Sequence, residues 1–141
     1  MLEYDINEKD VNYNERYNVR CKSTIGKENS PKNVIIYGFL EKRSKYIHLW
    51  KTRFFILTHN YLFAFTGIED DADCTMALDL KNIIECVEIN NEEKAKKEFG
   101  VRTIGTNYFF RAEKENIMKR WKDEINKVMK IKNMQSFKDM Q

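Results

Sequence analysis

Two short runs of alternating residues, 36–42 and 50–57, lie on either side of a loop at 43–49. Side chains of a β-strand alternate between its two faces. On the first run, one face carries Ile36, Gly38, Leu40 and Lys42, and on the second run one face carries Lys51, Arg53, Phe55 and Leu57. If the runs pair as a hairpin, both faces are apolar away from the loop and basic near it. The segment therefore predicts a pocket wall with a hydrophobic floor and a cationic mouth.

Basic residues near strand ends also have a simpler explanation. Lysine and arginine are commonly solvated there and protect strand edges from aggregation. That explanation is sufficient for any one of Lys42, Lys51 and Arg53 taken alone. Three such residues on matching faces beside one loop favour a binding site.

The same hairpin carries a family resemblance. The run Gly38-Phe39-Leu40-Glu41-Lys42, a short loop, and then Trp50-Lys51-Thr52-Arg53-Phe54-Phe55-Ile56-Leu57 resembles the opening of a pleckstrin homology (PH) domain. The usual pattern of that family is Gly-x-Leu-x-Lys followed by Trp-Lys-x-Arg-x-Phe-x-Leu. Near the other end of the chain, Trp121 lies nine residues after Ala112 and is similar to the helix tryptophan of the family. The resemblance covers about residues 34–130.

The periodicity of the rest of the chain predicts the other elements. Strands are expected at 34–42, 50–58, 61–65, 76–80, 83–89, around 99–103 and around 108–112, with turns at His59-Asn60 and Gly105-Thr106-Asn107. Ile117, Trp121, Ile125 and Val128 repeat at helical spacing and predict an amphipathic helix that ends around Lys130. The expected fold is mainly β with one α-helix: a seven-stranded bent antiparallel sheet, or partly open barrel, capped by a C-terminal amphipathic helix.

The length of 141 residues allows one domain with its own core. We expect a polar, partly disordered extension at 1–33, the PH domain at 34–130 and a tail at 131–141. No apolar run approaches the roughly 20 residues that span a bilayer, and no secretory leader is visible. The three cysteines have no paired spacing, so reduced thiols in a cytosolic setting are predicted, with neither a disulfide framework nor a zinc site.

The net charge of +3 is unevenly distributed. Residues 34–57 carry five basic and one acidic group, whereas residues 58–93 carry one basic and nine acidic groups. Such a distribution orients a molecule at an anionic surface more than it supplies affinity. The acidic segment disfavours nucleic acid as a partner, since it repels phosphates. We expect a monomer.

Catalytic patterns are absent from the sequence. Neither His48 nor His59 belongs to a recognisable nucleophile motif, and the glycine spacing fits no phosphate-binding loop. The acidic stretch at 69–73 lacks the calcium-loop pattern. We therefore predict a protein that is not an enzyme and that has no metal or cofactor.

The loop between the two runs mixes cations with apolar side chains. The candidate headgroup-binding residues are Lys42, Arg43, Lys45, Lys51 and Arg53, and the candidate membrane-inserting residues are Tyr46, Ile47 and Leu49. The alternative is that the apolar side chains fold back onto Trp50 or the N-terminal extension. The resemblance implies phosphoinositide binding, with Lys42, Lys51 and Arg53 as phosphate contacts.

Two departures from the family pattern narrow the expected ligand. Ala64 occupies a position that is usually tyrosine in tight phosphoinositide binders of this family, and the loop after that strand is acidic from Glu69 to Asp73. A triply phosphorylated inositol would lack partners on that side. We therefore expect phosphatidic acid or a monophosphorylated phosphoinositide as the lipid. A PH-fold protein-interaction module with no specific lipid is the alternative function.

The composition also resembles a narrower group. It is rich in lysine, asparagine and isoleucine, and a polar leader precedes a single domain, as in acylated apicomplexan PH proteins that sense phosphatidic acid on secretory organelles. Position two is Leu2, so the glycine that myristoylation requires is not there. The two resemblances together imply a cytoplasmic protein bound peripherally to the cytosolic face of a membrane, with a secretory organelle as the candidate.

Overall fold

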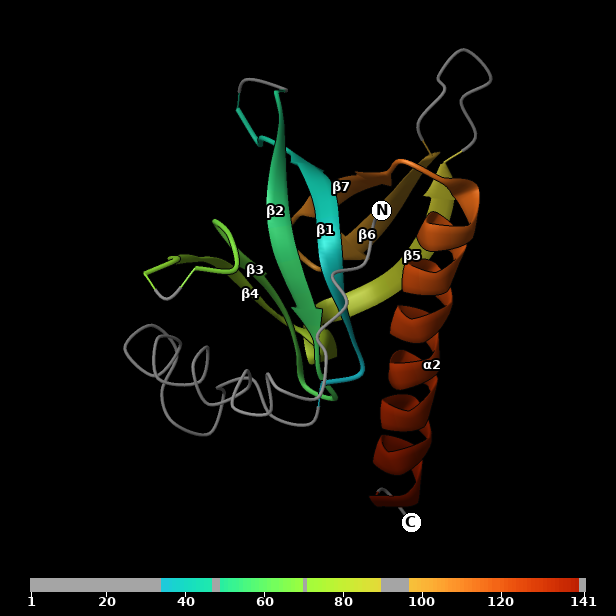
Figure 1. Ribbon diagram of the computed structural model, residues 1–141. Coiled ribbons are helices and arrows are strands. Elements are labelled where there is room, and N and C mark those ends of the chain that lie inside the picture. The colour runs from blue at the N-terminus through green and yellow to red at the C-terminus, as the bar shows by residue number, and fades with distance from the viewer. Residues whose placement is uncertain (1–33, 47–48, 70, 90–96, 140–141) are drawn as a thin grey trace.

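The computed structural model describes residues 34–46, 49–69, 71–89 and 97–139. The predicted N-terminal extension at 1–33 lies outside these residues. The described strands are β1 (Ile36–Arg43), β2 (Trp50–Leu57), β3 (Tyr61–Phe65), β4 (Cys74–Asp79), β5 (Ile83–Ile89), β6 (Lys97–Thr103) and β7 (Asn107–Ala112). A 3-10 turn, η3 (Leu80–Asn82), joins β4 to β5, and the helix α2 (Glu115–Asp139) follows β7 (Figure 1).

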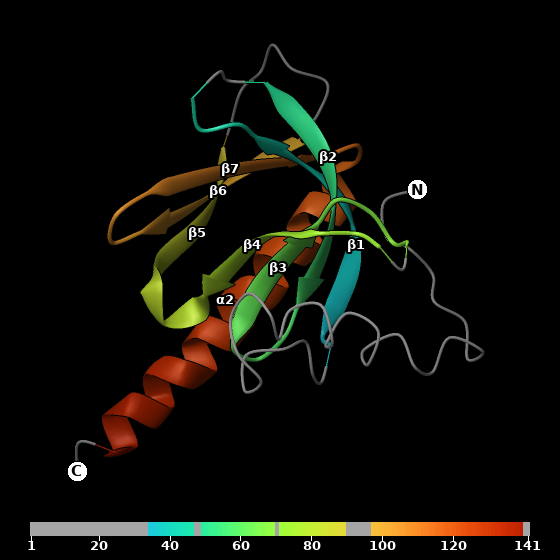
Figure 2. The ribbon, with the colours of Figure 1, turned by 90° about the vertical axis from the view of Figure 1, so that its left-hand side faces the viewer.

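The strands form one antiparallel sheet in the order β4-β3-β2-β1-β7-β6-β5. β1 pairs with β2 along its whole length but with β7 only at Glu41–Arg111 and Lys42–Phe110. The two halves of the sheet therefore share only the end of β1 and diverge below it, as the two views show (Figures 1 and 2). The predicted fold class, a bent seven-stranded antiparallel sheet with a C-terminal helix, is confirmed.

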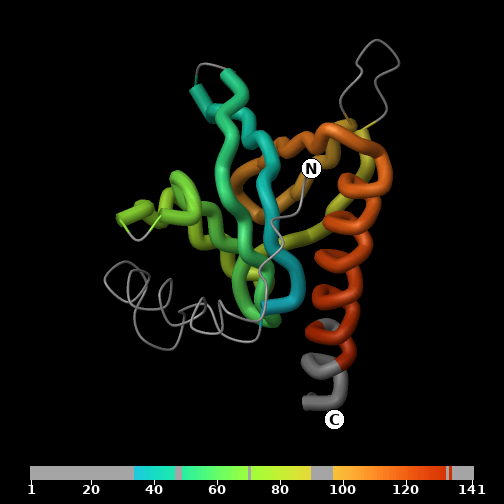
Figure 3. Tube along the Cα trace, viewed as in Figure 1, coloured from blue at the N-terminus to red at the C-terminus, as the bar shows by residue number. Residues whose placement is uncertain are grey.

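The register of the first hairpin places the alternating faces as predicted. Ile36 lies opposite Leu57, Leu40 opposite Arg53 and Lys42 opposite Lys51. The face that begins apolar at the bottom of the hairpin thus becomes basic near its loop. The Cα trace shows this hairpin rising above the rest of the sheet (Figure 3).

The main core lies between the inner side of the sheet and α2. Trp121 of α2 is fully buried and meets Phe55 of β2 edge to face, with 6.3 Å between ring centroids. The helix packs against β5, β6 and β7, and Asn126 Nδ2 donates to the Cys86 carbonyl at 3.2 Å. The predicted helical periodicity is confirmed, since Trp121, Ile125 and Val128 all belong to this core.

A second apolar cluster lies on the other side of β2 and β3. Phe54, Ile56, Phe63 and Phe65 form it, with the half-buried Phe39 against Phe54 at 5.2 Å between ring centroids. These side chains alternate with core residues along β2 and β3, which explains the unbroken apolar runs of both strands. Both faces of this half of the sheet are therefore apolar.

The helix differs from its predicted end. α2 continues to Asp139 rather than ending around Lys130. No glycine or proline occurs between Lys130 and Asp139 to stop it. Lys132 also donates a hydrogen bond from Nζ to Asn60 Oδ1 at 2.8 Å, which ties the extended part to the β2–β3 turn.

Candidate functional site

The end of β1 places Lys42 at the mouth of the sheet. Its side chain is half-buried, and its Nζ lies 5.6 Å from the centroid of the Tyr108 ring on β7. Burial lowers the pKa of Lys42, and repulsion from the nearby Arg53 lowers that pKa further. The site thus holds a cation that lacks full hydration, a state that an anionic ligand relieves.

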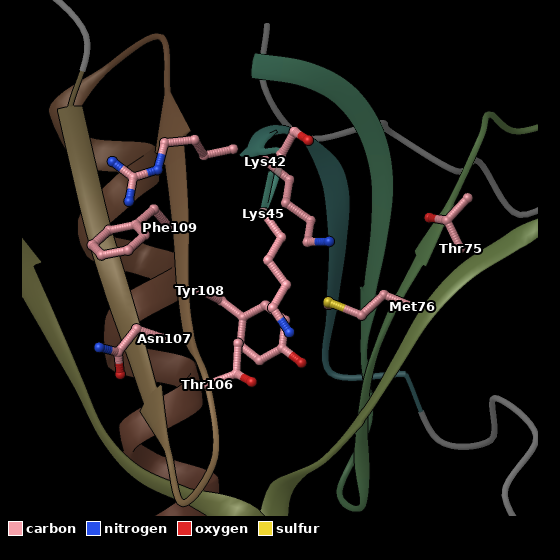
Figure 4. A pocket seen from close by; sticks show the side chains of 10 residues that line it. Lys42, Lys45, Thr75, Met76, Thr106, Asn107, Tyr108 and Phe109 are labelled. Carbon is pink, nitrogen blue, oxygen red and sulfur yellow. The ribbon is translucent and has the colours of Figure 1, made fainter. Parts of the chain in front are cut away.

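A cavity of about 280 Å³ opens beside this lysine. Its walls come from the end of β1 and the start of the following loop, from β4, and from the β6–β7 turn and β7 (Figure 4). The lining residues are Lys42, Arg43, Ser44 and Lys45 on the first wall, Thr75 and Met76 on the second, and Thr106, Asn107, Tyr108 and Phe109 on the third. Figure 4 shows the Lys42 and Lys45 side chains in the space between Tyr108 and Met76.

Of the five predicted basic residues, Lys42, Arg43 and Lys45 line this cavity. Lys51 is exposed on β2 opposite Lys42. Arg53 is half-buried, and its Nη1 donates to the Thr52 carbonyl at 2.9 Å. Arg53 therefore acts on the cavity through its charge beside Lys42, whereas three of the predicted cations reach the cavity wall.

Arg43 points differently from its neighbour Lys42. Its guanidinium lies 3.9 Å from the centroid of the Phe109 ring, a stacked cation–π contact. Because Phe109 alternates with the inward-facing Phe110 on β7, this contact lies at the outer rim of the cavity. Arg43 thus presents one edge of an oriented, planar guanidinium, a geometry that suits a phosphate oxygen.

An ion pair fixes the strands beneath the rim. Arg111 donates to Glu41 through Nε at 2.8 Å and through Nη2 at 3.2 Å. The guanidinium also lies 4.2 Å from the centroid of the Trp50 ring. This contact joins β7, β1 and β2 on the outer side of the hairpin and holds the cavity walls at a fixed separation.

The apolar side chains of the β1–β2 loop are exposed where the structure describes them. Tyr46 is 84% exposed and Leu49 is 56% exposed, so neither side chain is buried against Trp50, whereas the N-terminal extension, the other surface considered, lies outside the described residues. The backbone of the loop is closed by a hydrogen bond from Ser44 N to the Leu49 carbonyl at 2.6 Å. Ile47 and His48 lie outside the described residues.

Sequence reasoning missed the walls of the cavity that β4 and β7 provide. Thr75, Met76 and Tyr108 are far from the first hairpin in the sequence, and only the bend of the sheet brings them to it. The turn Gly105-Thr106-Asn107 was predicted as a turn but not as part of the site. No acidic side chain is among the described residues that line the cavity.

The described part of the chain offers little support for a metal site, a reactive cysteine or a membrane-spanning helix. No group of three or more His, Cys, Asp or Glu side chains there is arranged to hold a metal ion. Cys74 and Cys86 are free thiols, and burial raises the pKa of Cys86 to about 12, which keeps it protonated and unreactive. Among the same residues, none of the helices has the length and apolar character of a membrane span.

A bent seven-stranded antiparallel sheet with a C-terminal helix packed against its inner side is the PH type of fold. The family model of the PH domain matches residues 34–130. The chain therefore belongs to the PH domain family. No curated protein sequence matches the chain.

Solved structures of PH domains resemble this one. The Slm1-PH domain in complex with inositol-4-phosphate is 27% identical, with a TM-score of 0.56 over 70% of this chain and 98% of that chain. The Slm1-PH domain in complex with phosphoserine is 26% identical, with a TM-score of 0.56 over 71% and 99%. The human KIAA0053 PH domain is 22% identical, with a TM-score of 0.60 over 71% and 92%, a likeness of fold.

Proposed function

We propose that this PH domain binds anionic phospholipid headgroups, either phosphatidic acid or a monophosphorylated phosphoinositide, and so attaches peripherally to the cytosolic face of a membrane. The observation that carries the proposal is the convergence of Lys42, Arg43 and Lys45 on one cavity. Lys42 and Lys45 extend into the space between Tyr108 and Met76, whereas Arg43 lies at the rim over Phe109, and so small a set of cations suits one phosphate better than several. The Slm1-PH domain, a relative of similar fold, is seen with inositol-4-phosphate and with phosphoserine.

The chemistry of the other walls supports a singly phosphorylated ligand. Thr75, Thr106 and Asn107 add neutral hydrogen-bonding groups to the second and third walls. They can hydrogen-bond to the hydroxyl groups of an inositol ring or donate to the ester oxygens of phosphatidic acid, and they supply no charge for a further phosphate. The acidic residues of the β3–β4 connection do not line the cavity among the described residues, so they shape the field around it rather than contact the ligand.

The first test is sedimentation with vesicles of neutral lipid alone, or with phosphatidic acid, phosphatidylserine or phosphatidylinositol 4-phosphate added. The variant Lys42→Ala/Lys45→Ala removes two cavity charges, each worth about 1 kcal/mol near an anionic surface. We expect about 30-fold weaker binding, and weaker binding of the native protein at higher salt. Lys127→Ala/Lys130→Ala removes two exposed lysines of α2 and is the matched control.

The proposal predicts preference for a phosphomonoester lipid and unchanged binding by the control. Binding that follows total negative charge, with phosphatidylserine as good as the phosphomonoesters, would reduce the site to a general basic patch. Absence of binding to every vesicle would favour the protein-interaction alternative on the same fold.

The lowered pKa of Lys42 predicts a pH dependence. A bound phosphate favours the ammonium form and raises the pKa back toward its ordinary value of 10.5. As pH rises from neutral, the free protein loses the Lys42 proton before the complex does, so binding must take up a proton and weakens. Titration with inositol 4-phosphate should show affinity that falls before pH 10.5. Lys42→Arg stays charged and should not show this fall; the same fall in that variant would assign it to another group.

A further inference from the structure

The β6–β7 turn presents an apolar side chain to solvent. Ile104 is 81% exposed, close to the exposure of Tyr46 on the β1–β2 loop. A side chain added at the neighbouring Gly105 would meet no heavy atom within 4 Å. The turn therefore projects from the domain with nothing in the described structure packed against its tip.

Hydrogen bonds between Thr103 and Thr106 close the base of this turn. Thr103 N donates to the Thr106 carbonyl at 3.0 Å, and Thr103 Oγ1 donates to the same carbonyl at 2.6 Å. Thr106 N donates back to Thr103 Oγ1 at 3.0 Å. These four groups are already paired before the turn meets a membrane, which lowers the cost of bringing the base of the turn into a less polar medium. The bonds also hold Ile104 outward without further ordering.

The turn belongs to the rim of the cationic cavity. Thr106 lies on one wall of that cavity and Lys45 on the opposite wall, next to the exposed Tyr46. Two apolar tips on two different hairpins thus flank one cluster of positive charge. In Figure 2 the β1–β2 loop lies at the top and the β6–β7 turn at the left, whereas the acidic β3–β4 connection lies on the other side of the domain. An approaching anionic surface meets both tips before it meets the acidic residues.

We propose that Ile104 is a second membrane-contacting residue, which enters the interface of an anionic bilayer together with Tyr46 while the lipid phosphate occupies the cavity between them. This inference rests on the proposed function. A single exposed isoleucine is ordinary on a protein surface. Its place at the tip of a hydrogen-bonded turn on the rim of a basic cavity puts hydrocarbon beside positive charge, as an anionic bilayer surface requires of a protein that enters it. Two separated tips also fix the tilt of the domain, which one loop cannot do.

The test compares Ile104→Ser with Ile131→Ser. Ile131 is 52% exposed in the second half of α2, a helix that runs away from the β1–β2 loop (Figure 1), and its replacement removes the same side chain. Each protein is titrated with vesicles that contain phosphatidic acid or phosphatidylinositol 4-phosphate, and separately with soluble inositol 4-phosphate and glycerol 3-phosphate. We expect Ile104→Ser to bind vesicles about 10-fold more weakly, as burial of one aliphatic side chain implies, and to bind the soluble phosphates as the native protein does. Ile104→Leu should restore vesicle binding, and Ile131→Ser should leave it unchanged.

The outcomes separate this inference from the proposed function. If Ile104→Ser binds vesicles like the native protein while Lys42→Ala/Lys45→Ala does not, the second contact is wrong and the headgroup site stands. If Ile104→Ser also loses the soluble phosphates, the residue shapes the cavity and does not enter the bilayer. If the native protein binds no anionic vesicle, the proposed function and this inference both fail.

Discussion

Replacement of Trp121 with alanine is expected to lower the free energy of unfolding by about 3–5 kcal/mol. Trp121 is fully buried between α2 and the sheet and meets Phe55 edge to face. Alanine leaves a cavity of several heavy atoms that rigid strands on one side and a long helix on the other cannot close. Urea unfolding followed by circular dichroism measures the loss.

A matched replacement at the same position separates the ring from its polar atom. The Trp121 Nε1 is buried and has no hydrogen-bond partner among the described residues. Trp121→Phe keeps much of the apolar volume and removes that unsatisfied donor, so we expect a loss below about 2 kcal/mol. A Trp121→Ala protein about as stable as Trp121→Phe would mean that the helix is not fastened to the sheet through this ring.

Replacement of Phe110 with alanine is expected to cost about 3–5 kcal/mol as well, and to disturb the cavity. Phe110 is fully buried on β7. Its ring centroid lies 5.3 Å from those of Phe55 and Phe99, and 6.4 Å from that of Tyr108. It is also the β7 partner of Lys42 in one of the two pairs that join the halves of the sheet. Its loss removes the support beneath the cationic mouth.

The measurement combines unfolding with vesicle binding at a temperature where the variant is folded. Phe110→Leu retains most of the volume, and we expect less than half the loss of stability and near-native binding. Full binding by a folded Phe110→Ala protein would show that the walls of the cavity hold their places without this ring. Unfolding thus measures the contribution of Phe110 to stability, and vesicle binding of the folded variant measures its contribution to the cavity.

The sequence was sufficient to place the first hairpin and the helix. A period of two fixes which side chains share a face once the loop is located, and the observed pairs Lys42–Lys51 and Leu40–Arg53 agree with those faces. A period between three and four did the same for Trp121 in the core. Both patterns are local, so they depend on no knowledge of the bend in the sheet. The exposure of Tyr46 also agrees with its predicted place at the loop tip.

The rest of the site depends on contacts between distant segments. Thr75 and Tyr108 reach the cavity because β4 and β7 curve toward each other across the mouth of the sheet. No sequence period encodes that approach. The ring that orients Arg43 was missed for the same reason, since Phe109 read only as one residue of an alternating strand. The end of α2 was placed too early because the polar residues after Lys130 lack the apolar repeat, although nothing among them stops a helix.

Several expectations drawn from the sequence stay predictions, because the position of a side chain does not by itself show what it binds. The contributions of Lys51 and Arg53 to headgroup binding are of this kind, as are the acylated apicomplexan resemblance and the expected monomer. The domain boundaries at 33 and 130 and the absence of catalysis are also predictions. The family itself is established by the match over residues 34–130.

Because of the length and direction of α2, the net charge of the chain is a poor measure of its attraction to a membrane. The helix has 25 residues, about 37 Å, and runs from the side of β7 toward the end of the molecule away from the β1–β2 loop (Figure 1). With a bilayer at the cavity, an exposed lysine in the second half of the helix, such as Lys130, stands well beyond the roughly 8 Å over which physiological salt transmits a charge. Counterions from solution, rather than lipids, neutralise it. Two PH domains with equal isoelectric points can thus differ widely in the fraction bound to a membrane. The difference depends on which end of the domain carries the excess of basic residues.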